Sequence, residues 1–140
     1  MNAPISSMMN SPVLTVSMDD KVQAIEQFMH RHHLSWVPVR EPNGAIIGVV
    51  SAAELMQFHA LKKDPAAVAA WQVCSYKPLT VSAEASIAEV ARLMLEQRLH
   101  HVIVTDRGTS VGIVSSLDFV RRFAPEPGAP GAAARPETHR

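Results

Sequence analysis

The stretch Gly48-Val49-Val50-Ser51-Ala52-Ala53-Glu54 returns later in the chain as Gly112-Ile113-Val114-Ser115-Ser116-Leu117-Asp118. Each copy ends a longer stretch of similar pattern, which begins at Thr15-Val16-Ser17 in the first copy and at Thr80-Val81-Ser82 in the second. The offset between the copies is 65 positions at the start and 64 at the two glycines, so the second copy lacks one residue in between. Deletions of this kind fall in loops. The repeat predicts two copies of one structural unit.

The residue pattern within each copy predicts a β-α-β-β-α unit. A short apolar strand is expected at 13–16 and at 79–81, followed by a helix whose apolar residues recur at helical spacing. Asp19 or Asp20 in the first copy and Ser86 in the second suit the N-caps of these helices. Two β-branched runs separated by a glycine-containing turn then predict a hairpin, and a second helix is expected directly after it.

The predicted fold is α+β, with two units packed in pseudo-twofold symmetry around a shared core, because a unit of about fifty residues is marginal alone. The expected boundaries are a lead-in at 1–10, the first unit at 11–61, a linker with helical content at 62–72, the second unit at 73–123 and a tail at 124–140. The tail is rich in proline and glycine and poor in large apolar residues, which predicts disorder.

Composition excludes several classes of function. Thirteen basic residues offset thirteen acidic ones, which leaves no strong field for nucleic acid or for an anionic membrane surface. Cys74 is the only cysteine, so a disulfide within the chain is excluded and a reducing compartment is the simpler setting. No apolar stretch approaches twenty residues, and the N-terminus lacks the pattern of a signal peptide. We therefore expect a cytoplasmic protein.

The repeated pattern Gly-x-x-Ser-x-x-acid falls where a strand meets a helix, at Ser51/Glu54 and at Ser115/Asp118. Such a junction presents unpaired N–H groups, the positive end of a helix dipole and a hydroxyl, which together suit a phosphate. A carboxylate one turn into the helix suits a pair of vicinal hydroxyls, as on a ribose. The same spacing is also that of a capping box, in which the serine and the acid bond the helix's own N–H groups. The motif alone leaves both interpretations open.

Two tandem β-α-β-β-α units, each ending in this motif, resemble cystathionine β-synthase (CBS) domains, and the pair resembles a Bateman module. The resemblance covers about Met8 to Phe123. It implies a non-enzymatic regulatory module that needs no cofactor and binds an adenosine ligand, such as AMP, ADP, ATP or S-adenosylmethionine, in a cleft between the repeats. It also implies a homodimer and an effector protein that acts in trans.

The resemblance assigns ligand contacts to both repeats. Asp118 is expected to hold the ribose hydroxyls, and Ser115 with its neighbour Ser116 a phosphate. Glu54 departs from the family's usual aspartate, so the site of Ser51 and Glu54 is expected to be weak, empty or altered in its preference. The other expected contacts are a histidine pair ahead of one strand, its first-repeat counterparts, and the threonines at the strand starts: His100, His101, Ser35, Trp36, Thr15 and Thr80.

Two alternatives to a ligand sensor remain. The first is a structural or dimerisation scaffold with empty clefts, in which the Ser-x-x-acid pairs act only as helix caps. The second is a metal binder that uses His30, His32 and His33, since imidazoles at short helical spacing can bind zinc or copper. No cysteine or carboxylate accompanies these histidines, which favours a solvated helix end. The sequence shows no nucleophile with its base and no carboxylate pair, so no enzymatic activity is expected.

Overall fold

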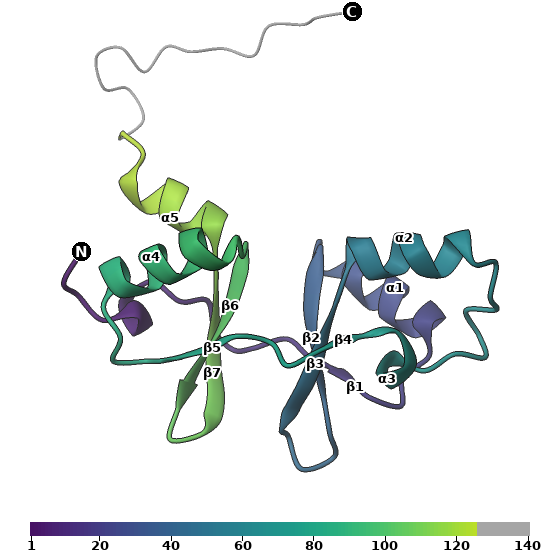
Figure 1. Ribbon diagram of the computed structural model, residues 1–140. Coiled ribbons are helices and arrows are strands. Elements are labelled where there is room, and N and C mark those ends of the chain that lie inside the picture. The colour runs from purple at the N-terminus through teal and green to yellow at the C-terminus, as the bar shows by residue number, and fades with distance from the viewer. Residues whose placement is uncertain (126–140) are drawn as a thin grey trace, which may run out of the picture.

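The computed structural model describes residues 1–125 and contains the two predicted β-α-β-β-α units (Figure 1). The first unit comprises β1 (Val16–Ser17), α1 (Val22–Arg31), β2 (Trp36–Arg40), β3 (Ile46–Ser51) and α2 (Ala52–Ala60). The second comprises β5 (Thr80–Ser82), α4 (Ile87–Gln97), β6 (His101–Asp106), β7 (Thr109–Ser115) and α5 (Ser116–Phe123). Three short elements lie outside the units: η1 (Ile5–Ser7), α3 (Ala70–Val73) and β4 (Ser75–Tyr76). Residues 126–140 of the predicted tail lie outside the described residues.

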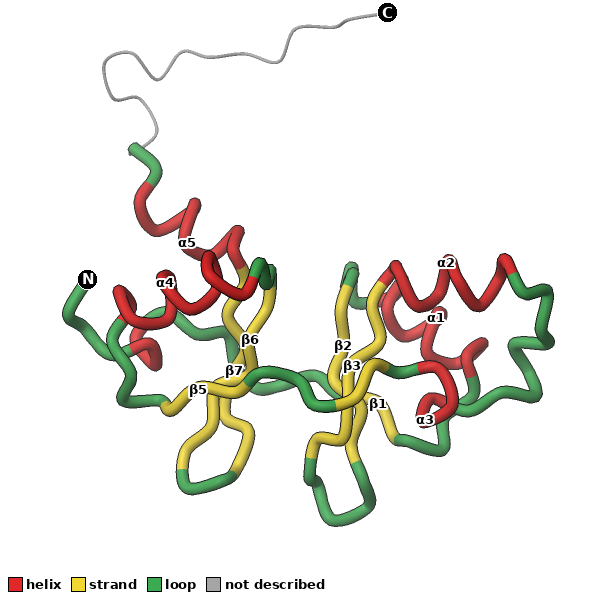
Figure 2. Tube along the Cα trace, in the orientation of Figure 1, coloured by secondary structure: helices red, strands yellow, loops and turns green. Residues whose placement is uncertain are grey.

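Both units have the same sheet topology. The first strand pairs in parallel with the second, with Val16 opposite Val39 in one unit and Val81 opposite Val104 in the other. The second and third strands form the predicted antiparallel hairpin. Figure 2 shows that both hairpins extend in the same direction, away from the helices, and that the helices lie outside the two facing sheets. The two sheets therefore face each other across the boundary between the units.

One predicted helix cap is wrong. The N-cap of α1 is Lys21, whereas the carboxylate of Asp20 accepts a hydrogen bond from the Ser17 N–H at 2.9 Å. This bond closes the turn after β1, so the Asp20 side chain is already engaged before the helix begins. The predicted cap of α4 is confirmed, because Ser86 Oγ accepts a bond from the Glu89 N–H at 3.1 Å.

Each unit has a hydrophobic core of its own, which corrects the expectation of one shared core. The helices of each unit cover one face of its own sheet, so the apolar side chains are buried locally. The first core contains Val16, Ile25, Met29, Val37, Val39, Val50, Ala70 and Cys74. The second contains Ile5, Val81, Ile87, Val90, Met94, Val102, Val104 and Val114.

Each core also receives a residue from the segment that precedes the other unit. Ile5, ahead of the first unit, is fully buried in the core of the second, and its N–H donates to the Ala85 carbonyl at 2.7 Å. Ala70, its counterpart 65 positions later, is fully buried in the core of the first unit and donates to the Asp20 carbonyl at 2.8 Å. Lead-in and linker therefore cross over, and each unit depends on the other's leading segment.

The crossing segments then pair with the last strand of the opposite sheet. β4 lies antiparallel to β3, with Ser75 opposite Val49, and Asn10 forms the equivalent bridge to Ile113 of β7. Glycine permits this approach. A Cβ at Gly48 would lie 2.5 Å from the Ser75 carbonyl oxygen, and one at Gly112 would lie 2.5 Å from Met9 Sδ.

Replacing Gly48 with alanine is expected to lower the free energy of unfolding by about 1–3 kcal/mol, because the new Cβ would collide with the backbone of β4. Gly112→Ala is the matched variant, and its cost should be smaller because two of the three atoms that it meets, Met9 Sδ and Cγ, can rotate away, while Met9 Cβ, at 2.9 Å, would have to shift by only a few tenths of an ångström. Urea unfolding of both variants and the unmodified chain measures the difference. Equal losses would contradict the role assigned to the β4 backbone.

Candidate functional site in the cleft between the units

Asp118 is held at the N-terminus of α5 by a complete capping box. The Ser115 N–H donates to Asp118 Oδ2 at 2.7 Å, and the Asp118 N–H donates to Ser115 Oγ at 3.3 Å. At the start of α2, Glu54 Oε2 likewise accepts a hydrogen bond from the Ser51 N–H, at 3.3 Å, and also contacts the Ser51 hydroxyl. The capping interpretation is therefore confirmed in full at Ser115/Asp118 and for the acid at Ser51/Glu54, and a ligand-binding role has to use atoms that the caps leave free.

The two oxygens of Asp118 have different surroundings. Oδ2 also accepts a hydrogen bond from Asn10 Nδ2 at 2.9 Å, so the crossing lead-in contacts the carboxylate directly. Oδ1 lies 3.8 Å from Arg121 Nη1, one helical turn further along α5. The Asp118 side chain is 10% exposed. Oδ1 is thus the oxygen with acceptor capacity left for a ligand.

These groups line a cleft of about 330 Å³ between the two units. Of the predicted site residues, the cleft brings together Asp118, Ser115, Ser35, Trp36 and His101. Sequence analysis missed the remaining lining residues: Asn10, Pro12, Leu14, His33, Leu34, Ile113 and Arg121. Asn10 lies 65 positions before Ser75 in the sequence, and in the structure each of these two residues contacts the acid of one motif.

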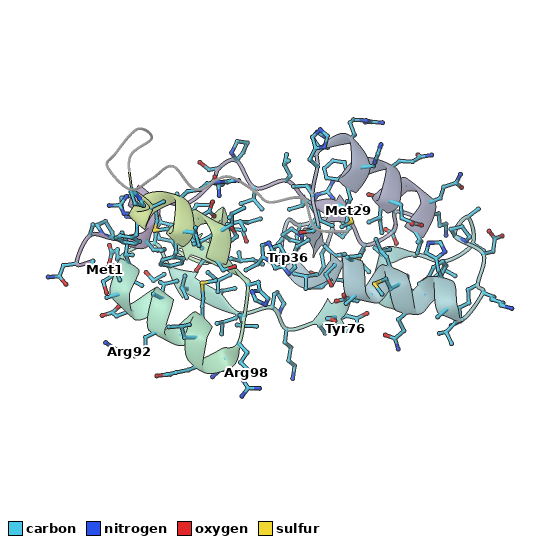
Figure 3. The ribbon with its side chains drawn as sticks, turned by 90° about the horizontal axis from the view of Figure 1, so that it is seen from above. Met1, Met29, Trp36, Tyr76, Arg92 and Arg98 are labelled. Carbon is cyan, nitrogen blue, oxygen red and sulfur yellow. The ribbon has the colours of Figure 1, made fainter. Side chains whose placement is uncertain are left out.

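An aromatic pair crosses the cleft. The Trp36 and His101 rings stack with their centroids 4.7 Å apart and their planes 6° from parallel. The two residues are counterparts in the repeat, one at the start of β2 and the other at the start of β6. Figure 3 shows Trp36 between the two units. Burial lowers the pKa of His101, and the neighbouring His100 lowers it further, while Asp118 acts in the opposite direction.

The first-repeat acid is more fully engaged than Asp118. Glu54 Oε2 contacts the Ser51 hydroxyl and amide, and Oε1 accepts a hydrogen bond from Ser75 Oγ at 2.7 Å. Partial burial acts to raise the pKa of Glu54, but the bonds from Ser51 and Ser75 outweigh it, so the pKa lies below its usual value. Neither Ser51 nor Glu54 lines the cleft. Both carboxylate oxygens of this site are thus occupied within the protein.

Four predicted contacts lie elsewhere. His100 and Ser116 line a groove of about 480 Å³ between α4 and α5. Thr15 and Thr80 line a different cavity, of about 590 Å³, at the hairpin end of the molecule. Within residues 1–125, no group of three histidine, cysteine or acidic side chains is arranged to hold a metal ion, and no helix is long and apolar enough to cross a membrane.

The crossed units and the capped acid at the cleft define a tandem module of two repeats with a cleft between them. The chain belongs to the CBS domain family, whose model matches residues 5–60 and 70–125. It is 28% identical over 122 residues to the uncharacterized protein MJ0188 of Methanocaldococcus jannaschii, covering 86% of this chain and 44% of that one. The match covers only 11% of the length of the first of its curated relatives and 44% of the length of the second.

Solved structures share the fold. The structure of CBSX2 in complex with AMP superposes with a TM-score of 0.73 at 22% identity, over 86% of this chain and 95% of that one. The CBS domain pair of MJ0100, in complex with 5′-methylthioadenosine and S-adenosyl-L-methionine, superposes with a TM-score of 0.76 at 19% identity, over 86% and 98%. At these identities the likeness establishes the fold alone.

The lowered pKa of His101 predicts a loss of stability on acidification. Below the ordinary value of 6.5, the unfolded chain binds more protons at this position than the folded chain does, so the free energy of unfolding falls as the pH falls through 6.5. Thermal unfolding at about pH 7.5 and about pH 5.5 brackets this window. His101→Phe keeps an aromatic ring against Trp36 but cannot bind a proton. Between the two pH values its free energy of unfolding should therefore fall less than that of the unmodified chain. His30→Phe, on the exposed surface of α1, is the control. An unchanged pH dependence in His101→Phe would refute the assignment.

Proposed function

We propose that the chain is a regulatory module that binds an adenine nucleotide in the Asp118 cleft and signals to a partner protein. The observation that carries the proposal is the position of Asp118 Oδ1, which is available to a ligand, beside a helix N-terminus and Arg121 in one cleft. A carboxylate accepts hydrogen bonds from vicinal hydroxyls, and a helix N-terminus with a cation attracts a phosphate. A nucleotide carries both groups.

The remaining lining suits the other parts of such a ligand. Leu14 and Ile113 offer apolar surface to a base, beside the Trp36 ring, one face of which His101 covers, and Ser35 adds a hydrogen-bonding hydroxyl. A volume of about 330 Å³ lies within the range of small-molecule sites. The complexes of CBSX2 with AMP and of MJ0100 with S-adenosyl-L-methionine add support, because both structures share this fold.

Signalling in this proposal is a population shift. A ligand in the cleft would touch Asn10 from the lead-in, Ser35 from the first unit and Asp118 from the second. It would favour the relative position of the units that makes all three contacts, and so change the surface offered to an effector in trans. No reaction is proposed, since a binding role accounts for each polar group of the cleft.

A scaffold without a ligand is the second candidate function. It is favoured by one observation: both acids already serve as helix caps, and each also bonds the crossing segment of the other unit, through Asn10 or Ser75. In this case the carboxylates hold the two units together, and the cleft stays empty.

Homodimer formation is part of the proposal. Four large apolar side chains on α4 and α5, two helices that line one groove, are more than half exposed, and none of the residues of α5 is buried. We call them the α4–α5 patch: Leu95, Leu117, Val120 and Phe123. A patch of this kind is typical of a protein–protein interface.

Nucleotide binding is tested with Asp118→Asn, which keeps the size of the side chain but removes its charge. Calorimetric titration with AMP, ADP, ATP and S-adenosylmethionine should give saturable binding for at least one of them, reduced tenfold or more in this variant. A ligand at a hundred times its Kd should raise the free energy of unfolding by about 2.7 kcal/mol. Glu54→Gln is the matched control and should retain binding. If none of the four ligands binds the unmodified chain, the scaffold candidate replaces the sensor.

The dimer is tested by placing charge in the α4–α5 patch. Leu117→Glu combined with Val120→Glu should convert a dimer to a monomer, because apolar contacts at an interface do not tolerate unpaired carboxylates. Light scattering coupled to size-exclusion chromatography gives the mass. Leu61→Glu, at another exposed apolar position, should leave the mass unchanged. A monomeric unmodified chain would rule out this part of the proposal.

A further inference from the structure

A second cavity lies apart from the proposed nucleotide site, between the ends of the two hairpins. Its volume is about 590 Å³, and it shares no lining residue with the Asp118 cleft. Residues of both units line this cavity. It lies at the hairpin end of the boundary between the units, and the helices lie at the other end. The lining consists of Val13, Thr15, Arg40, Asn43, Gly44, Ala45, Ile46, Thr80, Thr105, Gly108, Thr109 and Ser110.

Arg40 is the only charged residue in this lining. It ends β2 and is half-buried, and within residues 1–125 its guanidinium makes neither an ion pair nor a side-chain hydrogen bond. The strand ladder shifts register between Val39 and Arg40, and the other unit shifts at the counterpart, between Val104 and Thr105. Such bulges change the direction of a side chain and recur beside binding sites.

The rest of the lining supplies uncharged hydrogen-bonding groups. Thr15, Thr80, Thr109 and Ser110 contribute hydroxyls, and Asn43 contributes an amide. Glu41, next to Arg40 in sequence, does not line the cavity, so no carboxylate in the lining neutralises the guanidinium. The cavity therefore combines one positive charge with several hydroxyl groups. The Asp118 cleft instead combines a carboxylate with a helix N-terminus.

We propose that this hairpin cavity binds a small phosphate monoester that carries several hydroxyl groups, such as a sugar phosphate. The planar fork of an arginine matches the geometry of a phosphate and binds it through two parallel hydrogen bonds. The threonine and serine hydroxyls both donate and accept hydrogen bonds, which suits the hydroxyls of a sugar. The volume exceeds the need of a phosphate ion alone, so the sugar part is included in the proposal.

The experiment is a titration of the isotope-labelled chain with ribose 5-phosphate, followed by the amide resonances. Gly44 and Gly108 lie in the lining and report on the hairpin cavity, while Ser115 reports on the Asp118 cleft. Saturable shifts at both glycines are expected in the unmodified chain and in Asp118→Asn. The apparent Kd should rise tenfold or more in Arg40→Gln and less in Arg40→Lys, which keeps the charge without the fork. Arg92→Gln, on the exposed surface of α4, is the control for the loss of one positive charge.

The outcomes separate this site from the nucleotide site. Absence of shifts at Gly44 and Gly108, or equal affinity in Arg40→Gln, would overturn the proposal whether or not AMP binds at Asp118. Inorganic phosphate should bind more weakly than ribose 5-phosphate, and equal affinity would remove the sugar from the proposal. AMP that shifts the two glycines in Asp118→Asn would support the site and identify nucleotides as a source of its monoester.

Discussion

The close approach of two crossing segments at Gly48 and Gly112 is the contact on which the rest of the structure depends. At Gly48 a Cβ would meet the backbone of one segment at Ser75, and at Gly112 it would meet the Met9 side chain of the other. The same segments carry Ile5 and Ala70 into the two cores, where both are fully buried. Fixing these segments also places Asn10 and Ser75 against the two acids. The glycine of the Gly-x-x-Ser-x-x-acid motif therefore serves packing between the units, while the serine and the acid serve the helix cap.

Near-symmetry makes the differences between the two acids informative. Glutamate is one methylene longer than aspartate, so Glu54 reaches its cap with one oxygen and Ser75 with the other. In Asp118, Oδ2 accepts both the capping hydrogen bond from the Ser115 N–H and the hydrogen bond from Asn10. The other oxygen, Oδ1, faces Arg121 and remains available in the cleft. The two acids thus differ in the acceptor that they leave to a ligand, and they differ both by this methylene and in the partner from the crossing segment, Asn10 or Ser75. Trp36 and His101 are also counterparts in the two repeats that differ in chemistry, and their rings stack on each other.

Sequence reasoning predicted what is local or repeated. The units, the hairpins and the Ser86 cap follow from periodicity, turn residues and capping chemistry over short distances. Features that depend on how the two units face each other could not be predicted from these local patterns. The burial of Ile5 in the second unit is one, because nothing near Ile5 in sequence indicates its partner. The placement of Thr15 and Thr80 is another: both were expected in the nucleotide cleft, and the strands direct them to the hairpin cavity instead.

Each of the two cavities is lined from both units, so a change in the relative position of the units would alter both cavities. If a ligand in the Asp118 cleft favours one relative position of the units, the separation of Arg40 from the second-unit hydroxyls changes with it. Thermodynamic linkage then requires the reverse effect to be equal, so that an anion on Arg40 changes affinity at Asp118 by the same factor. This coupling requires the two units to change their relative position, because a ligand shifts only an equilibrium between states for which its affinity differs. The hydrogen bonds from Asn10 and Ser75 to the two acids, together with the burial of Ile5 and Ala70 in the opposite cores, oppose such a change.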